Sequence, residues 1–128
     1  MGENKKHKSH LSIFDLPIYR DYHNDFLMLI KELDKLLKNE NISHKKLIEN
    51  AYENIIEVYP VLNSGYNYWH SKGKLQLYNK VRILLSKLEM QVSLLEDLNL
   101  IKLNSYEFIF NSIKYLNGLI RKFELPKD

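Results

Sequence analysis

The sequence has 128 residues, 45% of them hydrophobic and 27% charged, which is enough for one domain with a buried core. It has no cysteine, which excludes disulfides, thiol catalysis and thiolate metal sites. It also lacks both an apolar run of the roughly eighteen residues that a membrane span needs and the apolar segment of a secretory signal. We therefore expect a cytoplasmic protein that has no membrane partner. The net charge of +3 does not by itself require a nucleic-acid partner.

The N-terminal residues 1–13 are polar and basic, which predicts a flexible tail. A first helix is predicted over about 16–38. Asp15 is its candidate N-cap, Pro17 is tolerated in its first turn, and apolar residues from Tyr19 to Leu37 recur with helical period.

Ser43 is a candidate cap for a second helix, whose apolar stripe runs from Leu47 to Leu62. Pro60 interrupts this pattern because proline removes one backbone hydrogen bond and clashes with the preceding turn. The helix is therefore expected either to kink at Pro60 or to end near Val58. Residues 63–73, rich in glycine, serine and asparagine, are expected to connect to the next helix.

The longest predicted helix runs from about Gly73 to Asn99 and is nearly 40 Å long. Its apolar residues alternate at spacings of three and four, as in a heptad seam: Tyr78, Val81, Leu85, Leu88, Val92 and Leu95. Leu84, Leu94 and Leu98 widen this seam into a broader stripe. A helix of this length needs other long helices to cover it.

A fourth helix is expected after a short link, with Asn104 or Ser105 as its cap and Pro126 closing the chain. Its seam is Tyr106, Ile109, Ile113, Leu116, Ile120 and Phe123. Short links favour antiparallel neighbours. The sequence thus predicts an all-α protein, an antiparallel up-down-up-down four-helix bundle that occupies residues 14–126.

Signals of enzymatic chemistry are weak along the chain. The histidines do not form the H-E-x-x-H pattern of zinc enzymes, there is no Glu-x-x-His pair for a di-iron site, and the four glycines are scattered. Glu49, Glu53 and Glu57 repeat at spacings of four, which is typical of a solvated helix face. We expect no enzymatic activity, no cofactor and no metal site.

Charge placement is more informative than the total. From Val58 to Leu88 there is no acidic residue, and the window contains aromatic residues including Tyr66, Tyr68 and Trp69. It also carries five cations: Lys72, Lys74, Lys80, Arg82 and Lys87. Repeated cations that face away from a core can bind phosphates. The window predicts RNA or DNA binding, while a protein that acts only through protein–protein contacts, as an adaptor or assembly subunit, is the alternative.

Three segments together resemble a known family: LPIY at 16–19, KLQLYNKVRILLSKLEMQVSLLEDLNLI at 74–101 and YLNGLIRKF at 115–123. They resemble the accessory variability determinant proteins of diversity-generating retroelements, small bacterial four-helix bundles that are related to the S23 family encoded in intervening sequences of ribosomal RNA genes. The resemblance implies a homopentamer that binds nucleic acid and a reverse transcriptase and supports mutagenic complementary-DNA synthesis. Lys74, Lys80, Arg82 and Lys87 match basic positions of the family's third helix, and Arg121 and Lys122 match a basic pair near the end of its fourth.

Overall fold

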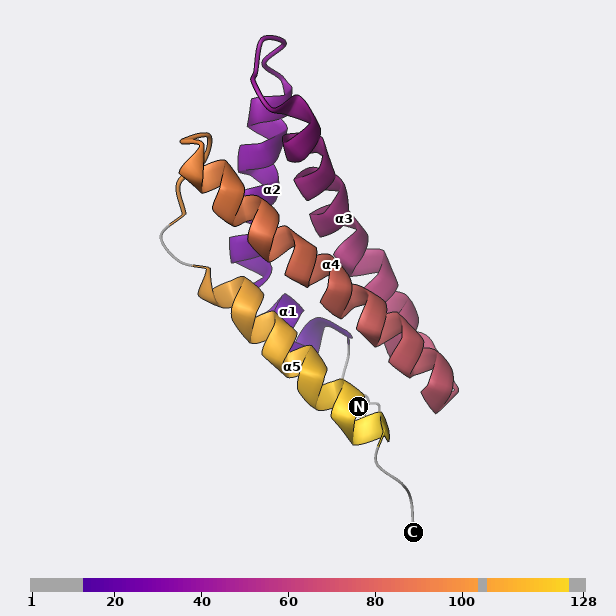
Figure 1. Ribbon diagram of the computed structural model, residues 1–128. Coiled ribbons are helices and arrows are strands. Elements are labelled where there is room, and N and C mark those ends of the chain that lie inside the picture. The colour runs from indigo at the N-terminus through magenta and orange to yellow at the C-terminus, as the bar shows by residue number, and fades with distance from the viewer. Residues whose placement is uncertain (1–12, 104–105, 125–128) are drawn as a thin grey trace, which may run out of the picture.

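The computed structural model describes residues 13–103 and 106–124, and across these ranges the chain is helical and contains no strand. A 3-10 turn at Ile13–Asp15 precedes the helices α1 (Pro17–Arg20), α2 (His23–Leu37), α3 (Lys45–Asn67), α4 (Ser71–Asp97) and α5 (Glu107–Glu124). The four long helices α2 to α5 pack against one another, and the short α1 contacts α2 and α5 (Figure 1). The prediction of an all-α protein with four long helices is confirmed. None of the described helices is both long enough and apolar enough to cross a membrane.

The first predicted helix is in fact two helices. α1 ends at Arg20, and the amide of Tyr22 donates to the Pro17 carbonyl at 3.1 Å, which closes a wide turn before α2 begins at His23. The N-cap of α1 is Leu16 rather than the expected Asp15. Ile18 and Phe26, on either side of the break, are both fully buried.

The second predicted helix starts and ends later than expected. The N-cap of α3 is His44, which has a left-handed backbone with φ of 58°, and not Ser43. α3 continues through Pro60 to Asn67, so an end near Val58 is wrong. Pro60 is exposed, and the turns that follow it are held by the burial of Leu62 and Gly65. The connection to α4 is therefore only Tyr68–His70.

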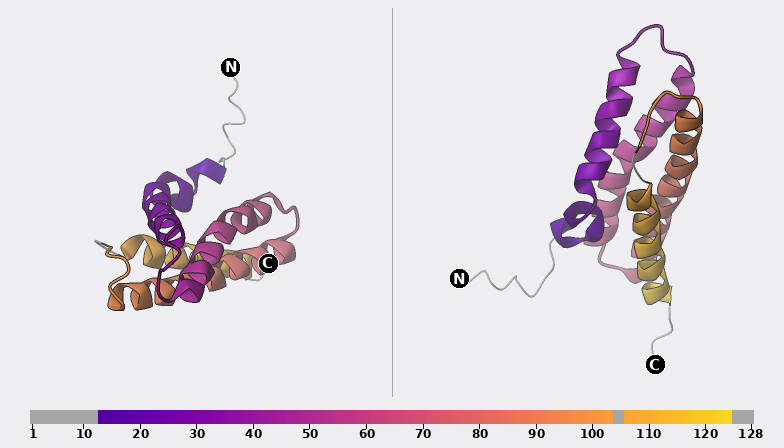
Figure 2. Two further views of the ribbon diagram at one scale, coloured as in Figure 1. Left: turned by 90° about the horizontal axis from the view of Figure 1, so that it is seen from above. Right: turned by 90° about the vertical axis from the view of Figure 1, so that its left-hand side faces the viewer.

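The α3–α4 hairpin forms the centre of the molecule. The chain reverses direction at Tyr68–His70, so that the two helices lie side by side (Figures 1 and 2). The predicted seam of α4 is buried at every position: Tyr78, Val81, Leu85, Leu88, Val92 and Leu95. Leu84 is also buried, but Leu94 and Leu98 are 44% and 40% exposed, so widening the seam to include them was wrong. They lie on the outward face of α4.

α5 covers the other side of α4. Ile109 and Leu116 of its predicted seam are fully buried, whereas Ile113, Ile120 and Phe123 are only partly buried. Phe108, which the predicted seam did not include, is buried and meets Phe26 of α2 edge to face with ring centroids 4.9 Å apart. The predicted caps Asn104 and Ser105, Pro126 and residues 1–12 of the predicted tail lie outside the described residues.

Candidate nucleic-acid interface

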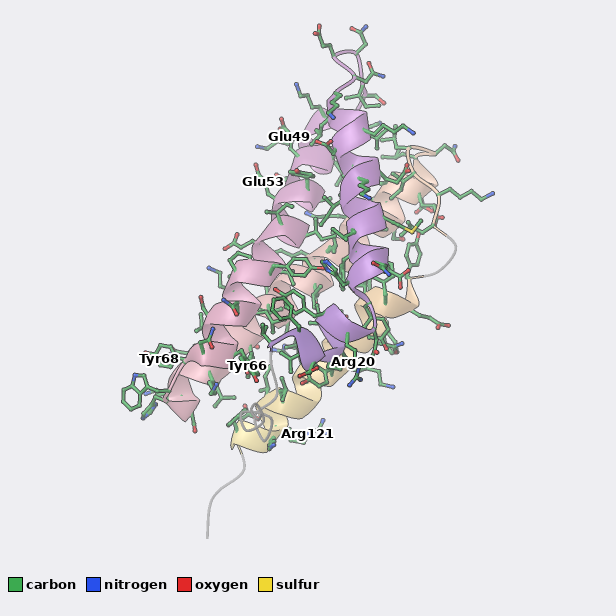
Figure 3. The ribbon with its side chains drawn as sticks, turned by 180° about the vertical axis from the view of Figure 1, so that it is seen from behind. Arg20, Glu49, Glu53, Tyr66, Tyr68 and Arg121 are labelled. Carbon is green, nitrogen blue, oxygen red and sulfur yellow. The ribbon has the colours of Figure 1, made fainter. Side chains whose placement is uncertain are left out.

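The aromatic and basic residues singled out by the sequence gather mainly toward one end of the molecule. Figure 3 shows Tyr66, Tyr68 and Arg121 toward the end where α3 meets α4, while Glu49 and Glu53 lie along α3 toward the other end. Because α5 runs along α4, its last turns come beside the first turns of α4. Tyr78 and Phe123, with ring centroids 6.2 Å apart, mark this contact.

Lys74 has a structural role at this end of the molecule. Its ammonium donates to the carbonyl oxygens of Gly65 at 3.0 Å and Tyr66 at 2.6 Å, in the last turn of α3. It also lies 5.8 Å from the ring centroid of Tyr66 and 6.0 Å from that of Tyr78. Partial burial lowers the pKa of Lys74. The side chain thus caps the end of α3 by donating hydrogen bonds to its carbonyls, as lysines near helix C-termini often do.

The other cations of α4 lie on two different edges of the helix. Lys80 faces α3 and pairs with Glu57 at 3.2 Å. Lys87, one heptad further along, is on the same edge. Arg82 faces α5, where its guanidinium donates to Asn117 at 3.4 Å and to Asn79 of its own helix. Successive residues of an α-helix are about 100° apart, so Lys80 and Arg82 point in directions roughly 160° apart.

Arg82 and Arg121 are brought together in a cleft between α4 and α5. The cleft has a volume of about 630 Å³ and is lined by Leu75, Gln76, Asn79, Arg82, Asn117, Ile120, Arg121 and Glu124. Its charged residues are two arginines and one glutamate. Among the described residues, the side-chain hydrogen-bond partners of Arg82 are neutral amides, so its positive charge is oriented without being neutralised. An arginine held in this way can present its remaining donors to a phosphate.

Four further predicted cations are exposed. In residues 13–103 and 106–124, no ion pair is formed by the side chains of Lys72, Lys87, Arg121 or Lys122. Lys72, Arg121 and Lys122 belong to the end of the molecule that carries the cleft. The structure therefore brings Arg82 and Arg121 together in the cleft and leaves Lys72 and Lys122 exposed toward the same end. It assigns Lys74 to the end of α3 and separates Lys80 and Lys87 from the two arginines.

The amides of the cleft were not predicted. Asn79 lies three residues before Arg82 on one helix, a spacing that places two side chains side by side, so it could have been found from the sequence. Asn117 belongs to α5, and its position opposite Arg82 depends on how α4 and α5 are aligned. Within the described residues, no group of three or more histidine, aspartate or glutamate side chains could hold a metal ion.

The sequence matches no protein-family model, no curated protein and no solved structure.

Proposed function

We propose that this chain is a non-enzymatic nucleic-acid-binding accessory protein of a diversity-generating retroelement, acting in the cytoplasm with a reverse transcriptase in mutagenic complementary-DNA synthesis. The proposal includes an antiparallel up-down-up-down bundle that assembles as a homopentamer. The retroelement context and the pentamer rest on the resemblance of residues 16–19, 74–101 and 115–123. The binding activity rests also on the arrangement of Arg82 and Arg121 in the cleft.

One observation supports the proposed binding activity. Arg82 is oriented by two neutral amides at the edge of an open cleft that Arg121 also lines. In such an arrangement a phosphate does not have to displace a carboxylate from Arg82 before it binds. Each phosphate contact also releases counterions from the nucleic acid, which favours association at low salt. Contacts of this kind position a protein on the backbone without selecting a base sequence.

The alternative is an adaptor that acts only through protein contacts. It is favoured by the outward face of α4, where Ile83, Met90 and Leu94 are 45%, 62% and 44% exposed. These residues follow one another at spacings of seven and four, so they form a partly apolar stripe on one side of the helix. A protein partner could bury this stripe, whereas phosphates could not.

The test compares two double variants that remove the same charge. Arg82→Gln with Arg121→Gln alters the cleft, and Lys80→Gln with Lys87→Gln alters the opposite edge of α4. Binding to labelled RNA and DNA oligonucleotides is measured by fluorescence anisotropy over a series of salt concentrations. We expect the cleft variant to lose affinity at low salt and its salt slope to fall by roughly 1.4–1.8, the value for two lost phosphate contacts. The control variant should lose less.

Three outcomes would count against the proposal. Equal losses in the two variants would mean that only total charge matters, and unchanged affinity in a folded cleft variant would place the binding surface elsewhere. No binding by the unmodified protein would favour the adaptor. The pentamer is tested separately, because light scattering that gives the chain mass of 15.3 kDa at micromolar concentration would contradict it.

A further inference from the structure

The connection between α3 and α4 presents an exposed set of aromatic rings. Trp69 is 86% exposed, the highest value among the large hydrophobic side chains described, and Tyr68 is 42% exposed. The two rings are nearly parallel, with an interplanar angle of 8° and centroids 6.5 Å apart. His70 meets the indole edge to face at 5.1 Å. Single exposed apolar side chains are ordinary on protein surfaces, but here three rings in sequence gather into one exposed aromatic patch.

The rings are held in position by the start of α4. Nδ1 of His70 accepts a hydrogen bond from the Lys72 amide at 3.2 Å, which fixes the imidazole as the cap of the helix. Gly73 leaves room for Tyr68: a Cβ at this glycine would stand 2.0 Å from Cε2 of the Tyr68 ring. The indole is therefore flanked by two rings that the helix start orients, and little freedom is lost when a ligand stacks on it.

We propose that Tyr68, Trp69 and His70 form a platform on which unpaired bases stack, so that the protein prefers single-stranded nucleic acid to duplex. This inference rests on the proposed nucleic-acid-binding function and adds a strand type to it. Bases paired within a duplex have no free face for an indole, whereas every unpaired base has one. Exposed Lys72 stands beside the platform, and Arg121 lies toward the same end of the molecule, so a strand stacked on Trp69 has cations near its phosphates (Figure 3).

Trp69 is the single tryptophan of the chain, so its fluorescence reports directly on the platform. The experiment titrates the full-length protein with a labelled single strand and with the blunt duplex of the same sequence. Anisotropy of the label measures binding, and tryptophan emission measures stacking. We expect about tenfold tighter binding of the single strand, with emission quenched by the single strand and unchanged by the duplex.

Two variants test the platform, and a third is the control. Trp69→Ala should weaken single-strand binding by about tenfold and leave duplex binding unchanged. Gly73→Ala should reduce single-strand binding by moving the Tyr68 ring, although alanine favours the helix. Phe110→Ala removes another exposed aromatic residue, 51% exposed and under the ammonium of Lys114, and should change neither affinity.

The experiment separates a failure of the stacking platform from a failure of the proposed nucleic-acid binding. Binding of a single strand without quenching of Trp69, or equal affinity for single strand and duplex, would overturn the platform and leave the proposed function intact. No binding of either form would overturn the proposed function and the platform with it. A shift of Trp69 emission with vesicles of phosphatidylcholine and phosphatidylglycerol, and none with oligonucleotides, would show that the platform meets a lipid surface and would overturn the inference.

Discussion

The ammonium of Lys74 lies 2.6 Å from the carbonyl oxygen of Tyr66, so that a side chain near the start of α4 closes the last turn of α3. The last carbonyls of a helix have no partners within that helix. Lys74 donates to two carbonyls of this turn, since it also reaches that of Gly65 at 3.0 Å, which accepts the Tyr68 amide at 3.3 Å as well. A cation at this position also interacts favourably with the helix dipole. The residue joins the two helices of the central hairpin.

We therefore predict that Lys74→Met lowers the free energy of unfolding by about 1–2 kcal/mol, because it removes charged hydrogen bonds and keeps the aliphatic stem. Urea denaturation measures the change. Lys72→Met is the control, because Lys72 is exposed and its side chain has no ion pair among the described residues. If Lys74→Met unfolds at the same urea concentration as the unmodified protein, the ammonium does not stabilise the end of α3.

Two leucines of α4 that the sequence assigned to one stripe are expected to differ in their contribution to stability. Leu88 is fully buried and Leu94 is 44% exposed. Leu88→Ala should cost about 2–5 kcal/mol, because it removes buried methyl groups and leaves a cavity. Leu94→Ala should cost less than about 1 kcal/mol in a single chain, as substitutions at exposed positions usually do. Equal costs in urea denaturation would mean that the outward face of α4 is covered in solution.

The buried face of α4 was predictable because a long helix that is buried on one side has apolar residues at regular spacings in its sequence. Every heptad position from Tyr78 to Leu95 is buried, as the spacing of three and four predicts. The error at Leu94 arises because spacing says where a residue points on its own helix, and does not say how far the neighbouring helices reach around it. The break between α1 and α2 was missed for a related reason, since the apolar period continues across Tyr22.

The cleft could not be predicted from the sequence pattern of any single helix, because it is formed by the packing of two helices. Lys80 and Arg82 are two residues apart, and the sequence could show only that both lie outside the seam. Which of them meets Glu57 and which meets Asn117 is decided by α3 packing on one edge of α4 and α5 on the other. The acid-free window therefore identified the cations but could not group them.

Buried tyrosines give the fold a predictable response to alkaline pH. Burial raises the pKa of Tyr78 to about 12, from an ordinary value near 10. Burial raises the pKa of Tyr59 in the same direction. The neutral phenols are thus favoured in the folded state, so their contribution to stability is fully present below about pH 10. The contribution of Tyr78 is lost as the pH rises through about 12.

We predict that the free energy of unfolding, measured in urea, falls as the pH is raised above about 10, and that Tyr78→Phe makes this fall shallower. Comparison of the variant with the unmodified protein cancels the contribution of lysines that titrate in the same range. Tyr68→Phe is the control, because Tyr68 is at the exposed connection. A pH dependence that is the same in Tyr78→Phe and in the unmodified protein would show that the Tyr78 phenol is not protected by the fold.

Two glycines within helices should respond in opposite ways to alanine. A Cβ at Gly118 of α5 would meet no atom within 4 Å, so Gly118→Ala should raise the free energy of unfolding by about 0.8–1 kcal/mol, the difference in helix propensity. At Gly65 a Cβ would stand 3.0 Å from the ring of Tyr78, which is only 3% exposed and has little room to move. Gly65→Ala should therefore lose the propensity gain and destabilise the protein, because the α3–α4 hairpin must open. Stabilisation by both substitutions, measured in parallel thermal and urea denaturation, would mean that α3 and α4 do not approach closely at Gly65.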